Sequence, residues 1–95
     1  MEIKAQLQII TITGNIKSIG DFAKIKSLVD EVSSKYENIT INIIDSLSIT
    51  SSVIGYFNKL ILKDKIGIKM NVGSKQLLSL LDDLNLTSTF KAKRS

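Results

Sequence analysis

The chain has 95 residues and contains no cysteine, histidine, proline or tryptophan. Without thiol and imidazole side chains it cannot build a thiolate zinc site, a Cys–His pair or a Ser–His–Asp triad. Thirteen Lys and Arg residues against nine Asp and Glu residues give a formal charge of +4, which points to an acidic partner only if the basic residues are clustered.

A chain of this length, with 43% hydrophobic and 23% charged residues, is expected to fold as one domain that needs no disulfide or metal. Three of its bases, Lys91, Lys93 and Arg94, lie within the last five residues. Residues 1–90 therefore hold ten bases and nine acids, a net charge of +1. We predict a single, nearly neutral domain over residues 1–90 and a basic, solvated C-terminal tail over residues 91–95.

The chain shows no targeting pattern and no membrane-spanning pattern. Its first residues are acidic and polar, and no apolar run approaches the ~18 residues that a membrane span requires. A Gly-rich phosphate loop of the kinds used by nucleotide-binding proteins is also absent from the sequence. We therefore expect a cytoplasmic protein without membrane contact and without a cofactor.

Two strands are predicted in the first thirteen residues. Apolar residues alternate with polar ones from Ile3 to Ile9, and the alternation restarts one step out of register at Ile10. This shift predicts a tight bend or a bulge between two strands. The pair Gly14-Asn15 has turn chemistry and is expected to end the second strand.

A first helix is predicted to begin at Ser18, whose side chain is suited to capping, with Asp21 adding negative charge to the first turn. Apolar residues recur at spacings of three and four from Phe22 to Val32. One stripe of this helix should therefore pack inward. The polar stretch Ser33-Ser34-Lys35 is expected to end it.

The remaining predicted elements are a β-branched central strand closed by Asp45, a second helix, another strand and a Leu-rich third helix. Their approximate ranges are 39–44, 53–63, 66–72 and 75–84. Asn85 is a suitable left-handed stop for the third helix. Thr87–Phe90 is expected to form either a last short strand or an extended tail.

The order of these elements places the chain in the α/β class. Alternation of strand, helix and strand implies parallel pairing through right-handed crossovers. We therefore predict a single mixed, mostly parallel β-sheet of about four to five strands with three helices packed on it.

Three loops are candidates for a functional site, because functional groups of open α/β sheets collect beyond the carboxyl ends of parallel strands. These loops cover residues 14–17, 45–52 and 73–75. The middle loop places five hydroxyl residues in eight positions and delivers three of them, Thr50-Ser51-Ser52, to a helix N-terminus. Two interpretations stay open: capping of the helix, or a site for phosphate, either bound or attached to serine.

The segment Thr50–Leu60, with the sequence TSSVIGYFNKL, resembles the Asp-Ser-Ser-Gly-Leu-Gly helix start of the STAS domain, the sulphate transporter and anti-sigma factor antagonist family. The strand that ends in Asp45, the turn at Gly14 and the closing stretch Leu84–Phe90 fall where that family's pattern has them. The resemblance covers nearly the whole chain in the order of its elements and is specific over residues 45–60.

Carried over by position, Ser51 matches the serine that an anti-sigma factor kinase phosphorylates in antagonist members of this family. Ser52 and Gly55 match the following serine and the second glycine of the motif. The chain departs from the motif at Thr50, which replaces the acidic residue before the phosphorylated serine, and at Val53, which replaces the first glycine.

The resemblance implies a non-enzymatic module of bacterial signalling that binds a protein partner, such as an anti-sigma factor serine kinase or a related regulator, and is switched by phosphorylation of Ser51. The residues expected to dock the partner or to surround the phosphate are Gly14, Asn15, Asp45, Thr50, Ser52, Gly55 and Lys75. Two alternatives stay open: a degenerate STAS-like scaffold that binds its partner constitutively, and nucleic-acid binding through the basic tail. Asp82 and Asp83 are neighbours on a helix, so their side chains diverge, and we expect no catalysis.

Overall fold

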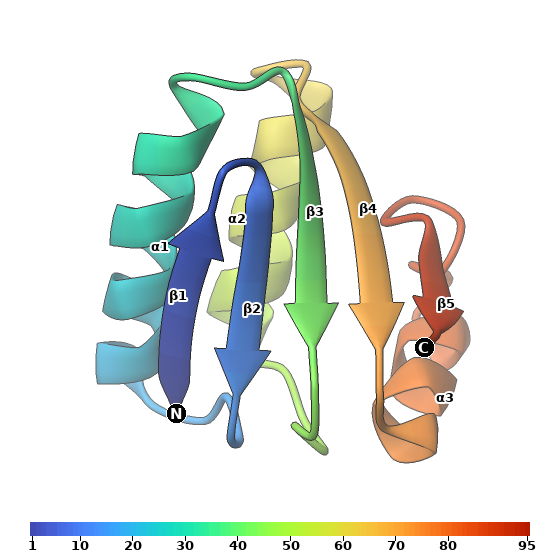
Figure 1. Cartoon of the computed structure of the whole chain (residues 1–95). Helices are drawn as coiled ribbons and strands as arrows, with labels where there is room; N and C mark the ends of the chain where they lie inside the picture. The colour runs from blue at the N-terminus through green and yellow to red at the C-terminus, as the bar shows by residue number, and fades with distance from the viewer.

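The computed structural model describes residues 1–95 as one five-stranded sheet covered by three helices (Figure 1). The elements are β1 (Glu2–Gln6), β2 (Ile9–Thr13), α1 (Ile19–Ser33), β3 (Asn38–Ile43), α2 (Ser51–Leu62), β4 (Gly67–Val72), α3 (Lys75–Asp83) and β5 (Ala92–Arg94). The strands lie in sequence order, with β1 antiparallel to β2 and every other pair parallel. The predicted fold class is confirmed.

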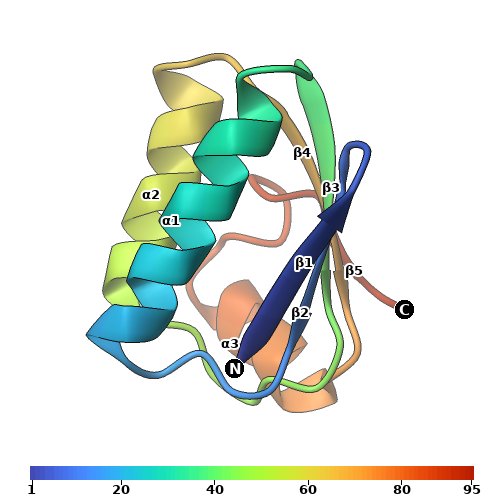
Figure 2. The same ribbon diagram turned by 60° about the vertical axis from the view of Figure 1, so that its left-hand side comes forward.

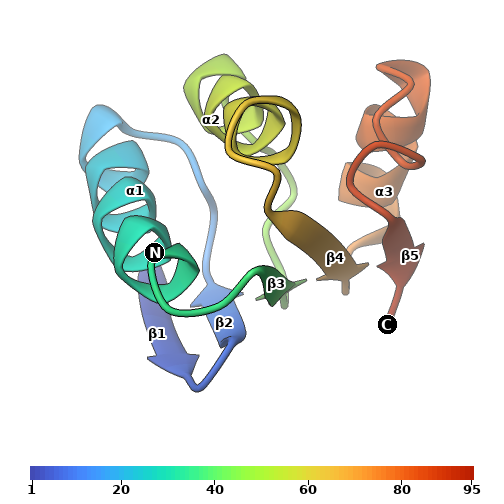
Figure 3. The same cartoon turned by 90° about the horizontal axis from the view of Figure 1, so that it is seen from above.

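All three helices lie on the same face of the sheet, as Figures 2 and 3 show from two directions. The reason is the handedness of the crossovers. From β2 to β5 each new strand is added on the same side of the previous one, and right-handed crossovers made in one direction place every connecting helix on one face. The opposite face of the sheet carries no helix.

The hydrophobic core lies between the sheet and this helical layer. Alternate strand residues point into it, and the central strands supply most of them: Ile10, Ile12, Ile39, Ile41, Ile43, Ile68, Met70 and Val72. The helices add a buried stripe each, including Ile25, Val29, Phe57, Leu60, Leu77 and Leu81. For α1 this is the inward stripe that the three- and four-residue spacing predicts.

The first two strands form a tight hairpin, so the bend that the shifted alternation predicts between them is confirmed. Leu7 and Gln8 make the turn, so Ile9 begins β2 and pairs with Gln6. Leu7, which the alternation assigns to the first strand, instead has a left-handed φ of 56° and a 70% exposed side chain. A two-residue turn demands such a backbone, and this local requirement overrides the apolar pattern.

The C-terminal residues also differ from their prediction. Thr87–Phe90 form hydrogen-bonded turns instead of a strand. Phe90 is fully buried, and its ring packs edge-to-face on that of Phe57 with the ring centroids 6.0 Å apart. The chain then reverses at Lys91, whose φ is 48°, and Ala92–Arg94 pair with the free edge of β4. The expected solvated tail is therefore largely a fifth strand, because Phe90 anchors the chain beside an unpaired strand edge.

The ends of the helices follow the predicted capping chemistry. The Ser18 side chain accepts a hydrogen bond from the backbone N–H of Asp21 at 3.0 Å, and the Asp21 carboxylate accepts from the backbone N–H groups of Lys17 and Ser18. The bond from Lys17 is the main cause that lowers the pKa of Asp21. Asn85, beyond the end of α3, has the left-handed φ of 58° that its position requires.

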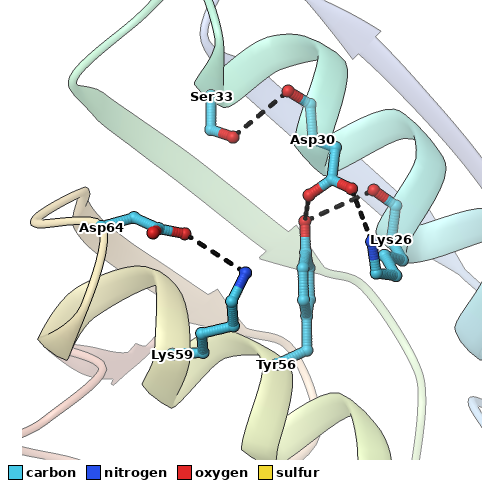
Figure 4. Close-up of polar contacts among 6 residues, drawn as sticks. All are labelled: Lys26, Asp30, Ser33, Tyr56, Lys59 and Asp64. Carbon is cyan, nitrogen blue, oxygen red and sulfur yellow. Dashed lines mark hydrogen bonds and ion pairs between the residues drawn. The ribbon is translucent and has the colours of Figure 1, made fainter.

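A polar bridge joins α1 to α2 on the outer side of the helical layer (Figure 4). The Tyr56 hydroxyl donates to the Asp30 carboxylate, which also accepts from Lys26 Nζ at 2.8 Å. Burial alone would raise the pKa of Asp30, but the hydrogen bonds from Lys26 and Tyr56 outweigh it and the pKa is lowered. Burial is the main cause that raises the pKa of Tyr56, and the hydrogen bond to Asp30 raises this pKa further.

None of the three helices is long and apolar enough to cross a membrane.

The bridge predicts a stability loss that depends on pH. We expect Tyr56→Phe to lower the free energy of unfolding at pH 7 by about 1–2 kcal/mol, because a bond to a charged group is lost. A carboxyl with a lowered folded-state pKa stabilises the fold above its unfolded pKa of about 3.9, and this contribution is lost as the pH falls through the folded value. Urea denaturation should therefore show the penalty shrinking between pH 7 and pH 3.

Tyr36→Phe is the matched control, since Tyr36 is half-buried and lies outside the bridge. A penalty for Tyr56→Phe that is equal at pH 7 and pH 3 would contradict the role of the Asp30 carboxylate.

Candidate functional site

Two loops at the carboxyl end of the sheet are joined by side-chain hydrogen bonds across about thirty residues of sequence. The backbone N–H of Gly14 donates to Asp45 Oδ1 at 2.7 Å, and the backbone N–H of Leu47 donates to Asn15 Oδ1 at 2.8 Å. Gly14 has a φ of 87°, a conformation that a residue with a side chain rarely adopts. Gly14, Asn15 and Asp45, predicted as site residues from separate segments, are thus in one loop pair.

Two further hydroxyls of the β3–α2 loop have structural roles. The Ser46 side chain is completely buried; it accepts from the backbone N–H of Ile16 at 3.0 Å and donates to the carbonyl of Ser48 at 2.7 Å. The Ser48 hydroxyl donates to the carbonyl of Ile16 at 3.1 Å. Ser46 and Ser48 therefore satisfy backbone groups that would otherwise be unpaired inside the loop pair.

The N-terminus of α2 separates the remaining hydroxyls into one cap and two exposed serines. Thr50 is the N-cap, and its Oγ1 accepts from the backbone N–H of Val53 at 3.3 Å. Ser51 and Ser52 follow as the first two helical residues, and both are exposed. Of the five hydroxyl residues in the loop, only these two have side chains that face solvent at a positive helix end.

Gly55 lies one turn further along α2, on the same exposed face as Ser51 and Ser52. A Cβ atom built at Gly55 would have no atom within 4 Å outside its local helix. The fold therefore does not require glycine here. The absence of a side chain leaves the helix backbone bare and accessible beside the two serines.

Lys75 belongs to a different part of the same edge of the sheet. It is the first residue of α3, after the N-cap Ser74, and it lines an open hollow of about 570 Å³. The other residues that line this hollow are Leu47, Gln76, Ser79, Leu80 and Asp83. Neither Ser51 nor Ser52 lines it, so the predicted role of Lys75 as a cation for a phosphate on Ser51 gains no support from this hollow.

Leu47 is a site residue that the sequence interpretation missed. Its backbone is held by Asn15, its side chain is 49% exposed, and it also lines the hollow beside Lys75. It therefore lies between the loop pair and α3. Its signal in the sequence is a leucine flanked by two serines, Ser46 and Ser48.

The acidic residues offer no alternative metal site, because no three of them come together in an arrangement that could hold an ion.

No protein-family model, no curated protein and no solved structure matches the chain significantly. The functional interpretation therefore depends on the residues of the site themselves.

The loop pair predicts a large difference between two serines in the same loop region. Ser46→Ala should lower the free energy of unfolding by about 1–3 kcal/mol, because it leaves the buried N–H of Ile16 without an acceptor. Ser52→Ala, at an exposed position, should change it by less than ~0.5 kcal/mol. Urea denaturation of both variants measures the difference, and equal stabilities would show that the loops are held together without Ser46.

Proposed function

We propose that this chain is a non-enzymatic protein-interaction module of the STAS type, and that phosphorylation of Ser51 switches its binding to a protein partner. The observation that carries the proposal is the division of the hydroxyls in the β3–α2 loop. Three of the five hydroxyls form hydrogen bonds with backbone groups of the loops or of the helix start. Ser51 and Ser52 remain exposed at the N-terminus of α2. A kinase needs such an accessible hydroxyl.

The position of Ser51 suits a switch that changes the surface without unfolding the domain. A phosphate adds about 1.5–2 negative charges, and at a helix N-terminus this charge interacts favourably with the helix dipole. The modified chain therefore keeps its structure. The partner instead meets a surface whose charge has changed, and a penalty of ~3 kcal/mol at the interface weakens binding roughly a hundredfold.

The surroundings of Ser51 suit a protein partner. The loop pair gives a rigid surface, Leu47 offers an exposed apolar side chain, and Gly55 allows close approach to the backbone of α2. Apolar side chains at the core of a contact surface, surrounded by polar ones, are typical of a protein interface. Within the STAS resemblance, the partner is a serine kinase of the anti-sigma factor type or a related regulator.

Charge substitution at Ser51 tests the switch. We expect Ser51→Asp to reduce capture of the partner from the native cell at least tenfold, while Ser51→Ala binds as the wild type does and is no longer phosphorylated in intact-mass spectra. Ser27→Asp, at an exposed position on α1, is the control and should bind normally. If both Ser51 variants bind like wild type and no phosphorylated mass occurs, the chain is a constitutive scaffold; its departures from the motif, Thr50 and Val53, favour that second candidate.

Gly55 provides a separate test of where the partner docks. A glutamine side chain at position 55 has open space around it and replaces glycine, a poor helix former. Gly55→Gln should therefore raise the free energy of unfolding by about 0.5–1 kcal/mol. Binding of the partner should nevertheless fall at least tenfold, since the new side chain occupies the approach to α2. A variant that gains stability and retains full binding would place the interface elsewhere.

A further inference from the structure

The face of the sheet opposite the helices is a continuous polar surface, here named the open sheet face. Because side chains alternate along strands, its residues are the strand positions between the core residues. The strand pairing aligns one row of them across all five strands: Lys4, Thr11, Asn42, Asn71 and Lys93. Four strand spacings separate the two lysines, a distance of about 19 Å.

The centre of this face consists of hydroxyl and amide side chains where strands favour apolar or β-branched ones. Asn is depleted in strands, yet Asn42 and Asn71 are the penultimate residues of β3 and β4, and Asn71 Nδ2 donates to Asn42 Oδ1 at 2.8 Å. Thr11 and Thr40 flank them in the pairing register. The surface is therefore rich in hydrogen-bonding groups.

Positive charge gathers on this face, although residues 1–90 carry a net charge of only +1. Four exposed lysines, the open-face lysines, belong to it or to its rim: Lys4, Lys69, Lys91 and Lys93. Glu2 is the one acidic residue at a strand position of the face, since the other eight acids follow or belong to helices and loops. Arg94 points away and donates from Nε to the carbonyl of Gly73.

A hollow at one end of the face combines charge with polar groups. It has a volume of about 330 Å³ and contains no acidic residue. Two lysines, Lys69 and Lys91, line it together with Gln8, Asn38, Thr40 and the backbone around Gly67. A phosphate group would meet there two cations together with amide and hydroxyl donors.

We propose that the open sheet face binds the phosphate backbone of a nucleic-acid duplex. Interfaces with nucleic acid are more polar and more positively charged than interfaces between proteins, which need an apolar core. Ile9 is the only large apolar side chain at the strand positions of this face that is clearly exposed, at 43%. Single strands are bound by aromatic stacking platforms, and all five aromatic residues, Phe22, Tyr36, Tyr56, Phe57 and Phe90, lie outside the five strands.

This inference extends beyond the proposed protein-binding function and uses a different surface. The lysines of the basic tail expected from the sequence belong to this surface, because the pairing of β5 with β4 places Lys91 and Lys93 on the same face or its rim as Lys4 and Lys69. With three or four phosphates neutralised and no base contacts, binding should be independent of sequence. The logarithm of the affinity should fall with the logarithm of the salt concentration with a slope of about −3.

The experiment measures fluorescence anisotropy of a labelled DNA duplex of about 20 base pairs, at NaCl concentrations from roughly 50 to 300 mM. Wild type should bind with a dissociation constant of about 1–100 µM at the lowest salt. Lys69→Gln combined with Lys93→Gln should weaken binding about tenfold and make the slope less negative by about two, one for each lysine.

The matched control is Lys35→Gln combined with Lys63→Gln, which removes the same charge from exposed positions just beyond the C-terminal ends of α1 and α2, outside the strands of the open sheet face. It should retain the wild-type slope, and circular dichroism should show both double variants folded. Ser51→Asp should bind the duplex normally, so failure of this inference and failure of the phosphorylation switch are distinguishable. Undetectable duplex binding, equal losses in both double variants, or tighter binding of the single strand or of a poly-glutamate peptide would each overturn the proposal.

Discussion

The right-handed crossover is the constraint from which the rest of this structure follows. Since the parallel strands are added in one direction from β2 to β5, it places α1, α2 and α3 on one face of the sheet. That face holds the core, and the opposite face is left to solvent. The same parallel order brings the loops after β2, β3 and β4 to one end of the sheet, where the helices begin. The molecule thus presents two separate surfaces, a loop edge and an open sheet face.

At the loop edge, satisfaction of backbone hydrogen bonds decides which side chains remain for function. Ser46, Ser48 and Thr50 are used by the backbone of the loops and by the cap of α2. Burial makes these bonds costly to lose, whereas Ser51 and Ser52 carry no such role and remain accessible. The proposed phosphorylation switch therefore concerns the part of the hydroxyl cluster that stability does not require. A charge added there changes an interface while the fold persists.

Much of the fold was predictable because its local signals agree. Alternation identified the strands, three- and four-residue spacing identified the buried stripes, and Ser18 with Asp21 identified the start of α1. Leu7 was misassigned because a two-residue turn and an apolar alternation give conflicting signals at one residue. The optional last strand, expected at Thr87–Phe90, forms instead at Ala92–Arg94, because three residues are too few for a period and become a strand only where β4 offers a free edge.

For the candidate site, the sequence alone determined the composition: no Cys or His, five hydroxyls before α2, and a basic C-terminal segment. Only the tertiary structure decided how these groups are used. Whether a serine is buried depends on the loop packed against it, as Ile16 is against Ser46. Likewise, a lysine contributes to a charged surface only through its neighbours across the sheet. Strand pairing joins Lys93 to Lys69 and Lys4, which lie far from it in the chain. Hydrogen bonding and charge act through space, so their partners are set by the fold and not by position along the sequence.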